Sequence, residues 1–437
     1  MNEMSTSSPS DAAAALPAPG PRRAGRVVAI SEALDAIRDG MRVYFAPICS
    51  VPTTLMDTMA DQHDRWRALT LCTDYLIEPV APFRHAGAPF HLLSLQPTPA
   101  TDAMRAAGAL STVSASYGQF AQLLEPGGPI AVDAVLVQVS PPGPEGRFSL
   151  GVGAGVTADL VRRAPLVIAE INPAMPYTFG ASECERHDFD FLVEVEHPLI
   201  ELAVPAGDDI ALAIGAHAAS QVSDGATLEF GIGAIPEAVL AALHGRADLG
   251  LHGGMISDAV VDLAASGALT GARKSLDPGF HCSAGVVGTA KAFAWVDRNP
   301  DVYLVDSRYS HGVTVLARQE RFTAINSAIE VACDGSVNAE VAGTRVISGP
   351  GGQPDFAIGA SLAPGGISLL TLRATAAGGK VSRIVNTLPP TSPTTVSRYL
   401  VDRVVTEYGV AQLKGRTPEQ RRDALRAVAH PDHRTGL

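Results

Sequence analysis

Two glycine-rich turns offer the kind of backbone donors that an anion or a polarised carbonyl oxygen needs. Each follows an apolar, strand-like run and precedes an expected helix; they contain Gly231, Ile232 and Gly233, and Gly351, Gly352 and Gln353. In the first turn, Pro236 is expected to be the first helical residue. Successive N–H groups at a helix start, without side chains in the way, suit an oxyanion or a phosphate. The alternative is that both turns only connect strands to helices.

Three side chains near the first turn can carry protons. Glu229 directly precedes the turn, where a carboxylate can act as a general base; the alternative is an ordinary polar residue held by a neighbouring donor. His252 stands before the pair Gly253-Gly254 and is either a catalytic imidazole or a satisfied structural residue. Asp258 is either a third catalytic candidate or a helix-start acid that favours the helix dipole.

Several chemistries are poorly supported by these patterns. Neither turn is followed by Gly-Lys-Ser/Thr, and neither forms a full G-x-G-x-x-G with a downstream acid, so nucleotide phosphate transfer and hydride transfer are disfavoured. The five cysteines are scattered without a C-x-x-C pair, and His430 and His433 have no third ligand nearby. We therefore expect no metal site and no disulfide framework.

Apolar runs alternate with amphipathic stretches along the chain, which is typical of an α/β protein. Near-continuous runs such as AVLVQV (134–139) and PLVIAEI (165–171) predict strands covered on both faces, hence mostly parallel sheets. A polar stretch at Pro205–Asp209 suggests a linker. We expect a disordered tail over residues 1–25, one α/β domain over 26–205 and a second over 206–437, with a ligand cleft at their junction.

Charge and hydropathy narrow the range of partners and of cellular location. The 437 residues carry a formal net charge of −12, which argues against nucleic acid as a partner. We found no apolar run of the ~20 residues that a membrane span requires. The first residues lack the basic and apolar regions of a secretory signal, so we expect a cytoplasmic protein.

Ordered motifs along most of the chain give a more specific indication. LGLHGGMISD (249–258) resembles the LG-I-H-[ST]-E-M-x-S-D segment of the acetyl-CoA hydrolase/transferase family, the class I coenzyme A transferases typified by 4-hydroxybutyrate CoA-transferase. QVSPPGPEGRFSLGVG (138–153), AEINPAMPYTFG (169–180), INSAIEV (325–331), SGPGGQPDFAIGA (348–360) and AHPDHR (429–434) resemble further segments of that family. The resemblance implies two CoA-transferase-like α/β domains.

The same resemblance implies a CoA thioester as substrate, no permanently bound cofactor, and a homodimer or larger homo-oligomer. In the family, the glutamate of the first segment is the nucleophile that forms a glutamyl-CoA thioester; here that position is Gly254, and Gly253 replaces Ser or Thr. Glu229 stands where the family has Gln. We therefore expect an acyl-CoA enzyme that hydrolyses the thioester or transfers the acyl group directly to a carboxylate or another small acceptor. The alternative is a non-catalytic CoA- or acyl-binding protein, or a subunit of an active homologue.

Overall fold

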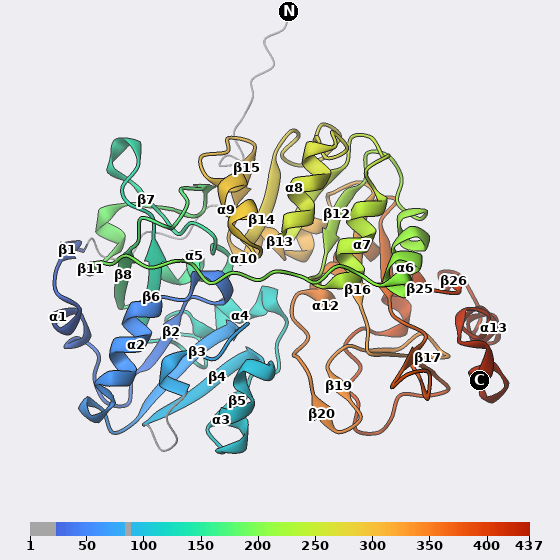
Figure 1. Ribbon diagram of the computed structural model, residues 1–437, viewed down its shortest axis with the longest axis horizontal. Coiled ribbons are helices and arrows are strands. Elements are labelled where there is room, and N and C mark those ends of the chain that lie inside the picture. The colour runs from blue at the N-terminus through green and yellow to red at the C-terminus, as the bar shows by residue number, and fades with distance from the viewer. Residues whose placement is uncertain (1–22, 84–88) are drawn as a thin grey trace, which may run out of the picture.

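The first half of the chain forms one parallel sheet, on the left of the computed structural model in Figure 1, which describes residues 23–83 and 89–437. Its eight strands run in the order β1-β11-β8-β6-β2-β3-β4-β5. The strands are β1 Arg26–Val27, β2 Arg42–Phe45, β3 Leu69–Tyr75, β4 Phe90–Gln96, β5 Leu110–Thr112, β6 Ala134–Val139, β8 Leu166–Ile171 and β11 Phe191–Glu194. The helices among them are α1 Ile30–Leu34, α2 Thr53–Asp61, α3 Asp102–Ala106, α4 Tyr117–Leu124 and α5 Gly155–Val161.

The second half forms a nine-stranded sheet in the order β26-β25-β21-β16-β12-β13-β14-β15-β9. All its pairings are parallel except the β25–β26 hairpin. The strands are β9 Phe179–Gly180, β12 Thr227–Phe230, β13 Gly250–Ile256, β14 His281–Val286, β15 Val302–Leu304, β16 Phe322–Ser327, β21 Ile367–Thr371, β25 Arg403–Thr406 and β26 Gly409–Gln412. The helices are α6 Asp209–Ala219, α7 Ala234–Ala242, α8 Asp258–Ala265, α9 Ala290–Val296, α10 Ser307–Ser310, α11 Val313–Leu316, α12 Gln353–Leu362 and α13 Pro418–Val428.

Short strands complete the fold around these two sheets. They pair as β7 Phe148–Ser149 with β10 Glu183–Cys184, β17 Glu330–Ala332 with β18 Val337–Asn338 and β24 Ile384–Val385, β19 Val341–Ala342 with β20 Arg345–Val346, and β22 Thr375–Ala376 with β23 Val381–Ser382. The described helices include none that is both long and apolar enough to cross a membrane.

The central strands are buried on both faces, which explains their continuous apolar sequences. Every residue of β6 is buried, and β6 pairs with β2 on one side and β8 on the other. Such a strand has no solvent face, so its side chains can be apolar without alternation. The predicted α/β class with mostly parallel sheets is confirmed. One apolar cluster contains Val135 of the first sheet and Leu369 of the second, so the two halves share a core.

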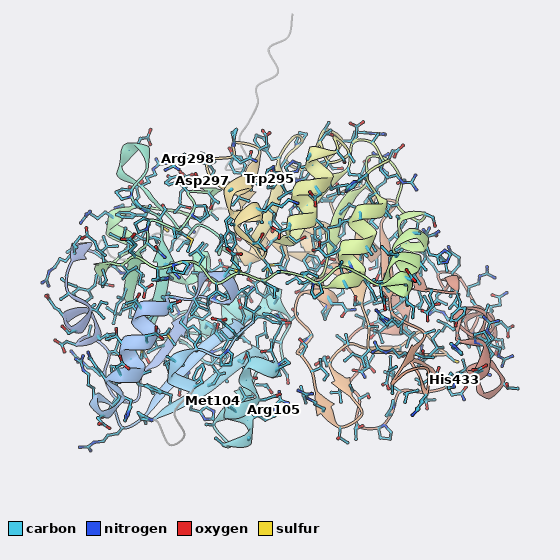
Figure 2. The ribbon with its side chains drawn as sticks, in the orientation of Figure 1. Met104, Arg105, Trp295, Asp297, Arg298 and His433 are labelled. Carbon is cyan, nitrogen blue, oxygen red and sulfur yellow. The ribbon has the colours of Figure 1, made fainter. Side chains whose placement is uncertain are left out.

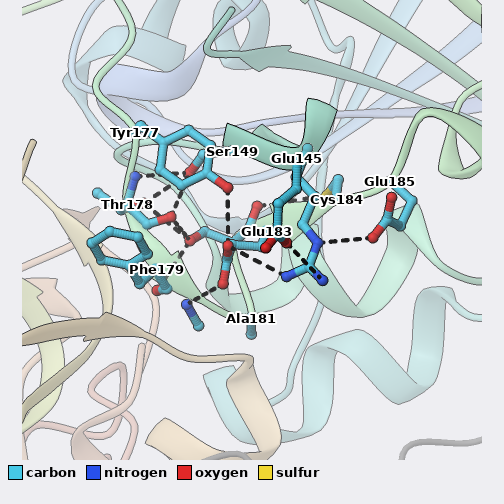
Figure 3. Close-up of polar contacts among 12 residues, drawn as sticks. Glu145, Ser149, Tyr177, Thr178, Phe179, Ala181, Glu183, Cys184 and Glu185 are labelled. Carbon is cyan, nitrogen blue, oxygen red and sulfur yellow. Dashed lines mark hydrogen bonds and ion pairs between the residues drawn. The ribbon is translucent and has the colours of Figure 1, made fainter. Parts of the chain in front are cut away.

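β9 ties the two halves together. It belongs to the first half of the sequence, yet it pairs with β15 at the edge of the second sheet. A polar network holds the segment around it in place (Figure 3): Ser149 Oγ donates to Thr178 O at 2.9 Å, and Tyr177 Oη donates to Glu183 Oε1 at 2.9 Å. Asp297, labelled in Figure 2, accepts from Tyr177 N at 2.8 Å. The first half therefore supplies the last strand of the second sheet.

Two other connections join the halves. The chain crosses between the sheets in a stretch without helix or strand, residues 195–208, drawn in green across the front of Figure 1. At the lower edge of the same view, Arg105 of α3 (Figure 2) donates to Val346 O at 3.1 Å, and Arg345 pairs with Asp102 at 2.8 Å. The division that we predict at residue 205 lies within the crossing stretch and stays a prediction.

Two details differ from the sequence analysis. Residues 1–22 of the predicted tail lie outside the described residues, but residues 23–25 are ordered: Arg23 N and Gly25 N donate to His187 O and Phe189 O. Helix α7 begins at Ala234, so Pro236 is its third residue and not its first. Gly233, at φ 131°, precedes the helix in a conformation that glycine adopts readily, and it permits the earlier start.

Candidate functional site

A cavity of about 240 Å³ lies where the carboxyl ends of strands from both sheets face one another. In parallel sheets this edge is the usual position of ligand sites. From the first half come Ile48, Asp74, Tyr75, Gln96 and Tyr117; from the second come Glu229, Phe230, Gly231, Ile232, Gly254, Met255, His311, Asn326, Ser327, Ala339, Ser348, Gly349, Pro350, Gly351, Gly352, Gln353 and Phe356. These described residues include no Lys and no Arg.

Glu229 is a buried carboxyl group at the end of β12, with 2% of its surface exposed. Its Oε2 accepts a hydrogen bond from Asn326 Nδ2 at 2.7 Å, and Asn326 lies on the neighbouring strand β16. Burial raises the pKa of Glu229 to about 8, against a smaller lowering by the Asn326 hydrogen bond. The group therefore holds a proton near neutral pH and can exchange it with a ligand.

Gly254 lies on β13 beside the Glu229 strand and leaves open space in the cavity wall. A Cβ built at Gly254 would be 3.6 Å from His311 Nε2, which is ordinary van der Waals contact, and its φ is not left-handed. Gly253 is tighter, because its Cβ would be 3.1 Å from Glu229 Cγ. The backbone therefore allows a side chain at 254, whereas one at 253 would press on Glu229.

His311 is the centre of a ring stack beside this space. Its ring centroid is 4.3 Å from that of Tyr117 and 4.4 Å from that of Phe356. Ser310 Oγ donates its proton to Asp306 O at 2.8 Å, so its 2.9 Å contact with His311 Nδ1 uses the imidazole N–H. This network assigns a bare lone pair to Nε2, the nitrogen nearest Gly254. Burial lowers the pKa of His311 to about 3, so the ring is neutral.

The second glycine turn closes the cavity at the start of α12. A Cβ at Gly352 would collide with the His311 ring, so only glycine lets the backbone come this close. Within the described ranges, the N–H groups of Gly352 and Gln353 have no acceptor. They lie at a helix N-terminus, where partial positive charge gathers.

Contacts between α12 and α4 fix this turn against the first half. Asp355, in the first turn of α12, accepts from Ser116 Oγ at 2.7 Å and from Gly118 N at 2.9 Å. Tyr117 N donates to Gly351 O at 2.8 Å. The starts of the two helices are thus joined, and the cavity between the sheets depends on this junction.

Asp74 is the second carboxyl group of the cavity. It is the next-to-last residue of β3 and has 1% of its surface exposed, and neither carboxyl oxygen has a hydrogen-bond partner among the described residues. Burial raises the pKa of Asp74 to about 7. The N–H groups of Asp74 and Tyr75 lie close enough to oppose this effect without meeting hydrogen-bond geometry. Asp74 is therefore a buried acid beside the cavity whose carboxyl oxygens form no hydrogen bond with the described residues.

Seven of the residues singled out in the sequence line the cavity: Glu229, Gly231, Ile232, Gly254, Gly351, Gly352 and Gln353. His252, Asp258, Gly233 and Gly253 are not among its lining residues. His252 Nε2 donates to Tyr309 O at 3.0 Å and its Nδ1 contacts Gln319 Nε2 at 3.2 Å, which fits the structural alternative. Asp258 accepts from Thr289 Oγ1 at 2.9 Å and from Ala292 N at 3.0 Å, so it serves the start of α9.

His252 also belongs to a buried polar group with Asp277 and Cys282, whose potential ligand atoms lie within 4.8 Å of one another. Lys274 Nζ lies 3.4 Å from Cys282 Sγ and donates to Phe280 O at 2.7 Å. A lysine ammonium at this position opposes a second cation, and burial together with Lys274 lowers the pKa of His252 to about 4. These contacts indicate that His252, Asp277, Cys282 and Lys274 form a buried structural network.

Sequence reasoning missed Asp74, Tyr117, His311 and Asn326. Asn326 stands inside the quoted INSAIEV segment, and Asp74 stands near the end of a strand-like run. Polar residues at the ends of predicted strands could therefore have identified these two. Tyr117 and His311 carried no such signal, because only the tertiary fold brings their rings together.

Comparison with known proteins agrees with this architecture. The acetyl-CoA hydrolase/transferase N-terminal domain matches residues 24–194, and the C-terminal domain of the same name matches residues 288–437. Residues 195–287, which hold β12 and β13, lie between the two matches. A 4-hydroxybutyrate coenzyme A transferase of Clostridium kluyveri is 43% identical over 308 residues, 70% of this chain and 72% of the relative.

Solved structures resemble the whole described fold. RipA from Yersinia pestis has a TM-score of 0.87 at 28% identity, covering 94% of this chain and 96% of that chain. A 4-hydroxybutyrate CoA-transferase from Porphyromonas gingivalis has a TM-score of 0.79 at 32% identity with the same coverage. With both domains matched in order and a relative of 43% identity, the chain belongs to the acetyl-CoA hydrolase/transferase family.

Proposed function

We propose that this protein acts on an acyl-CoA thioester without a glutamyl-CoA intermediate at position 254. Glu229 serves as general base for an acceptor that occupies the space beside Gly254. The acceptor is water, which makes the protein a thioesterase, or a small second substrate, which makes it an acyltransferase. The observation that carries the proposal is that the buried carboxyl group of Glu229 and the side-chain-free Gly254 line the same cavity.

The pKa of Glu229 supports its role as base. General bases work best when their pKa lies near the working pH. With a pKa of about 8, roughly one Glu229 in ten is ionised at pH 7, and ionising the rest costs on the order of 1 kcal/mol. Asn326 holds Oε2, which leaves Oε1 for the acceptor.

His311 is the competing base, and the magnitudes favour Glu229. Its Nε2 lone pair adjoins Gly254, so its position is suitable. Its pKa of about 3 makes the protonated ring costly near neutral pH, whereas protonated Glu229 is stable there. We infer that His311 accepts a hydrogen bond from the acceptor and orients it, while Glu229 takes the proton.

The start of α12 supplies electrostatic help. The free N–H groups of Gly352 and Gln353 can receive the thioester oxygen as it gains negative charge. Loss of one such donor typically costs about 3 kcal/mol of transition-state stabilisation. Gly352 adjoins the His311 ring that faces Gly254, so one reacting carbonyl can reach the α12 donors and the acceptor together.

Release of the CoA thiol tests the proposal. It is measured with acetyl-CoA, butyryl-CoA and acyl-CoAs of intermediate length as substrates, with and without added acceptors. Wild type is compared with Glu229→Gln and with Glu194→Gln, an exposed control at the end of β11. We expect Glu229→Gln to lower turnover by about 10²–10⁴-fold with little change in acyl-CoA binding. Equal turnover in wild type and Glu229→Gln would remove Glu229 from the mechanism.

A non-catalytic acyl-CoA-binding protein is the second candidate, and the missing side chain at Gly254 favours it. Both candidates predict saturable thermal stabilisation by acyl-CoA. They differ in turnover: stabilisation without thiol release, for every acyl-CoA and acceptor tried, would support the binding protein. No stabilisation by any acyl-CoA would contradict both.

A further inference from the structure

We propose that the acceptor of this site carries an ammonium group, which binds to the Asp74 carboxylate in the cavity. This inference rests on the proposed acyl-CoA function and names the chemical class of the second substrate. A carboxylate acceptor, of the kind named in several relatives, is disfavoured by the charges that line this cavity.

The unsatisfied carboxyl group of Asp74 is the first observation. Burying a polar group without a partner costs several kcal/mol, and an ionised one costs more. Asp74 is 1% exposed, both oxygens lack a partner among the described residues, and the side chain borders the cavity. Such a group is stabilised when a ligand brings the missing donors, and an ammonium brings three.

The balance of charge in the cavity is the second observation. Its described lining holds two carboxyl groups, Asp74 and Glu229, and no Lys or Arg. The imidazole of His311 is neutral. A bound carboxylate would bring a negative charge with no Lys or Arg in the described lining to balance it, whereas an ammonium can pair with the Asp74 carboxylate.

The walls around Asp74 also suit a cation. The aromatic rings of Tyr75, Tyr117, Phe230 and Phe356 line the cavity with it. Cations bind favourably over aromatic faces. A second space beside Asp74 measures only about 20 Å³, against about 240 Å³ for the main cavity. The ammonium therefore enters from the main cavity.

The reaction balances with the groups present. The bound ammonium loses one proton to the Glu229 carboxylate, and its lone pair forms a C–N bond to the thioester carbon. The C–S bond then breaks with its electron pair on sulfur, and a second nitrogen proton passes to the CoA thiolate. One acyl-CoA and one ammonium give one amide, one CoA thiol and one proton.

Thermal-shift titration tests the binding step without requiring turnover. The probes are n-propylammonium chloride, sodium propionate and 1-butanol, with KCl at matched ionic strength. We expect saturable stabilisation of wild type by propylammonium only. Asp74→Asn, which keeps the shape, should bind propylammonium about 10- to 100-fold more weakly, as expected for loss of a charged hydrogen bond. Asp423→Asn, an exposed change on α13, should bind it like wild type.

Amide formation from acetyl-CoA and propylamine, followed by mass spectrometry, supplies the kinetic test. Asp74→Asn should raise KM for the amine by at least about 10-fold and leave KM for acetyl-CoA unchanged. Equal stabilisation by propionate, or full ammonium selectivity in Asp74→Asn, would overturn the inference. Acetyl-CoA hydrolysis without any amine preference would overturn it while sparing the proposed function. Absence of acyl-CoA binding and turnover would remove the proposed function itself.

Discussion

Replacing Glu229 with Gln should make the protein less active and, as the pH rises from 4.5 to about 8, increasingly more stable than wild type. The Gln side chain keeps the shape, and its Oε1 can accept the Asn326 hydrogen bond, but it does not ionise. The pKa of Glu229 is raised from its ordinary 4.5 to about 8, so the folded protein keeps a proton that the unfolded chain releases. The stability contributed by this proton is fully present below pH 4.5 and is lost as the pH rises through 8.

The size of the effect follows from the two pKa values. The interval from 4.5 to about 8 corresponds to about 5 kcal/mol at 1.36 kcal/mol per pH unit. Effective dielectric constants in proteins reduce such values, so this is an upper bound. Unfolding entropies of about 2.1 cal/mol/K per residue give about 0.9 kcal/mol/K for 437 residues, so 5 kcal/mol corresponds to a change in Tm of about 5 °C.

Calorimetry from pH 5 to pH 9 measures this difference. The Tm of Glu229→Gln minus that of wild type should rise with pH, by up to about 5 °C. Glu194→Gln should follow wild type at every pH, because its side chain is exposed. Over the same range, wild-type turnover should increase with pH through about 8 as Glu229 ionises. Parallel Tm curves for wild type and Glu229→Gln would refute the raised pKa, and the argument for this base with it.

Three further predictions address the cavity wall and the junction of the halves. Wild type incubated with acyl-CoA should show no CoA adduct on the peptide around Gly254 by mass spectrometry; Gly254→Glu, whose Cβ has ordinary clearance, should fold and gain such an adduct. Gly253→Ser should lower turnover without lowering acyl-CoA binding, because its Cβ would lie 3.1 Å from Glu229 Cγ and shift the base; unchanged turnover would show that the wall adapts. Asp355→Asn weakens the two hydrogen bonds from Ser116 and Gly118 at the start of α4. It should therefore lower the free energy of unfolding in urea titrations by about 1.5–3 kcal/mol and raise KM for acyl-CoA. An unchanged KM would show that the contact between α4 and α12 does not affect the cavity.

The fold was largely accessible from the sequence, because burial on both faces leaves a local signature. The run at 134–139 is β6 and the run within 165–171 is β8. β9 was not accessible: a strand of two residues has no periodicity to detect, and its partner β15 lies more than 120 residues away.

The site was accessible only in part, for a similar reason. Glycine turns mark the positions of backbone donors locally, so the turns at 231 and 351 were found. Asp74 faces Glu229's cavity only because the two sheets meet at their carboxyl ends, a relation that no local pattern contains. His252 was predicted as a catalytic candidate because it stands two residues from Gly254. In the structure both of its ring nitrogens are used in hydrogen bonds to Tyr309 and Gln319, so closeness in sequence did not indicate a place in the cavity.

Because the first half of the chain supplies β9 to the second sheet, the protein cannot be cut into two independent fragments at the boundary between its halves. A fragment that begins near residue 206 would lack β9 and leave the backbone of β15 unpaired at an open sheet edge, where other chains can add. It would also expose apolar side chains that the shared core now covers. We expect such a fragment to aggregate when made alone and to become soluble when the complementary fragment, ending near residue 205, is made with it. The two halves are therefore separate in sequence but obligate partners in folding.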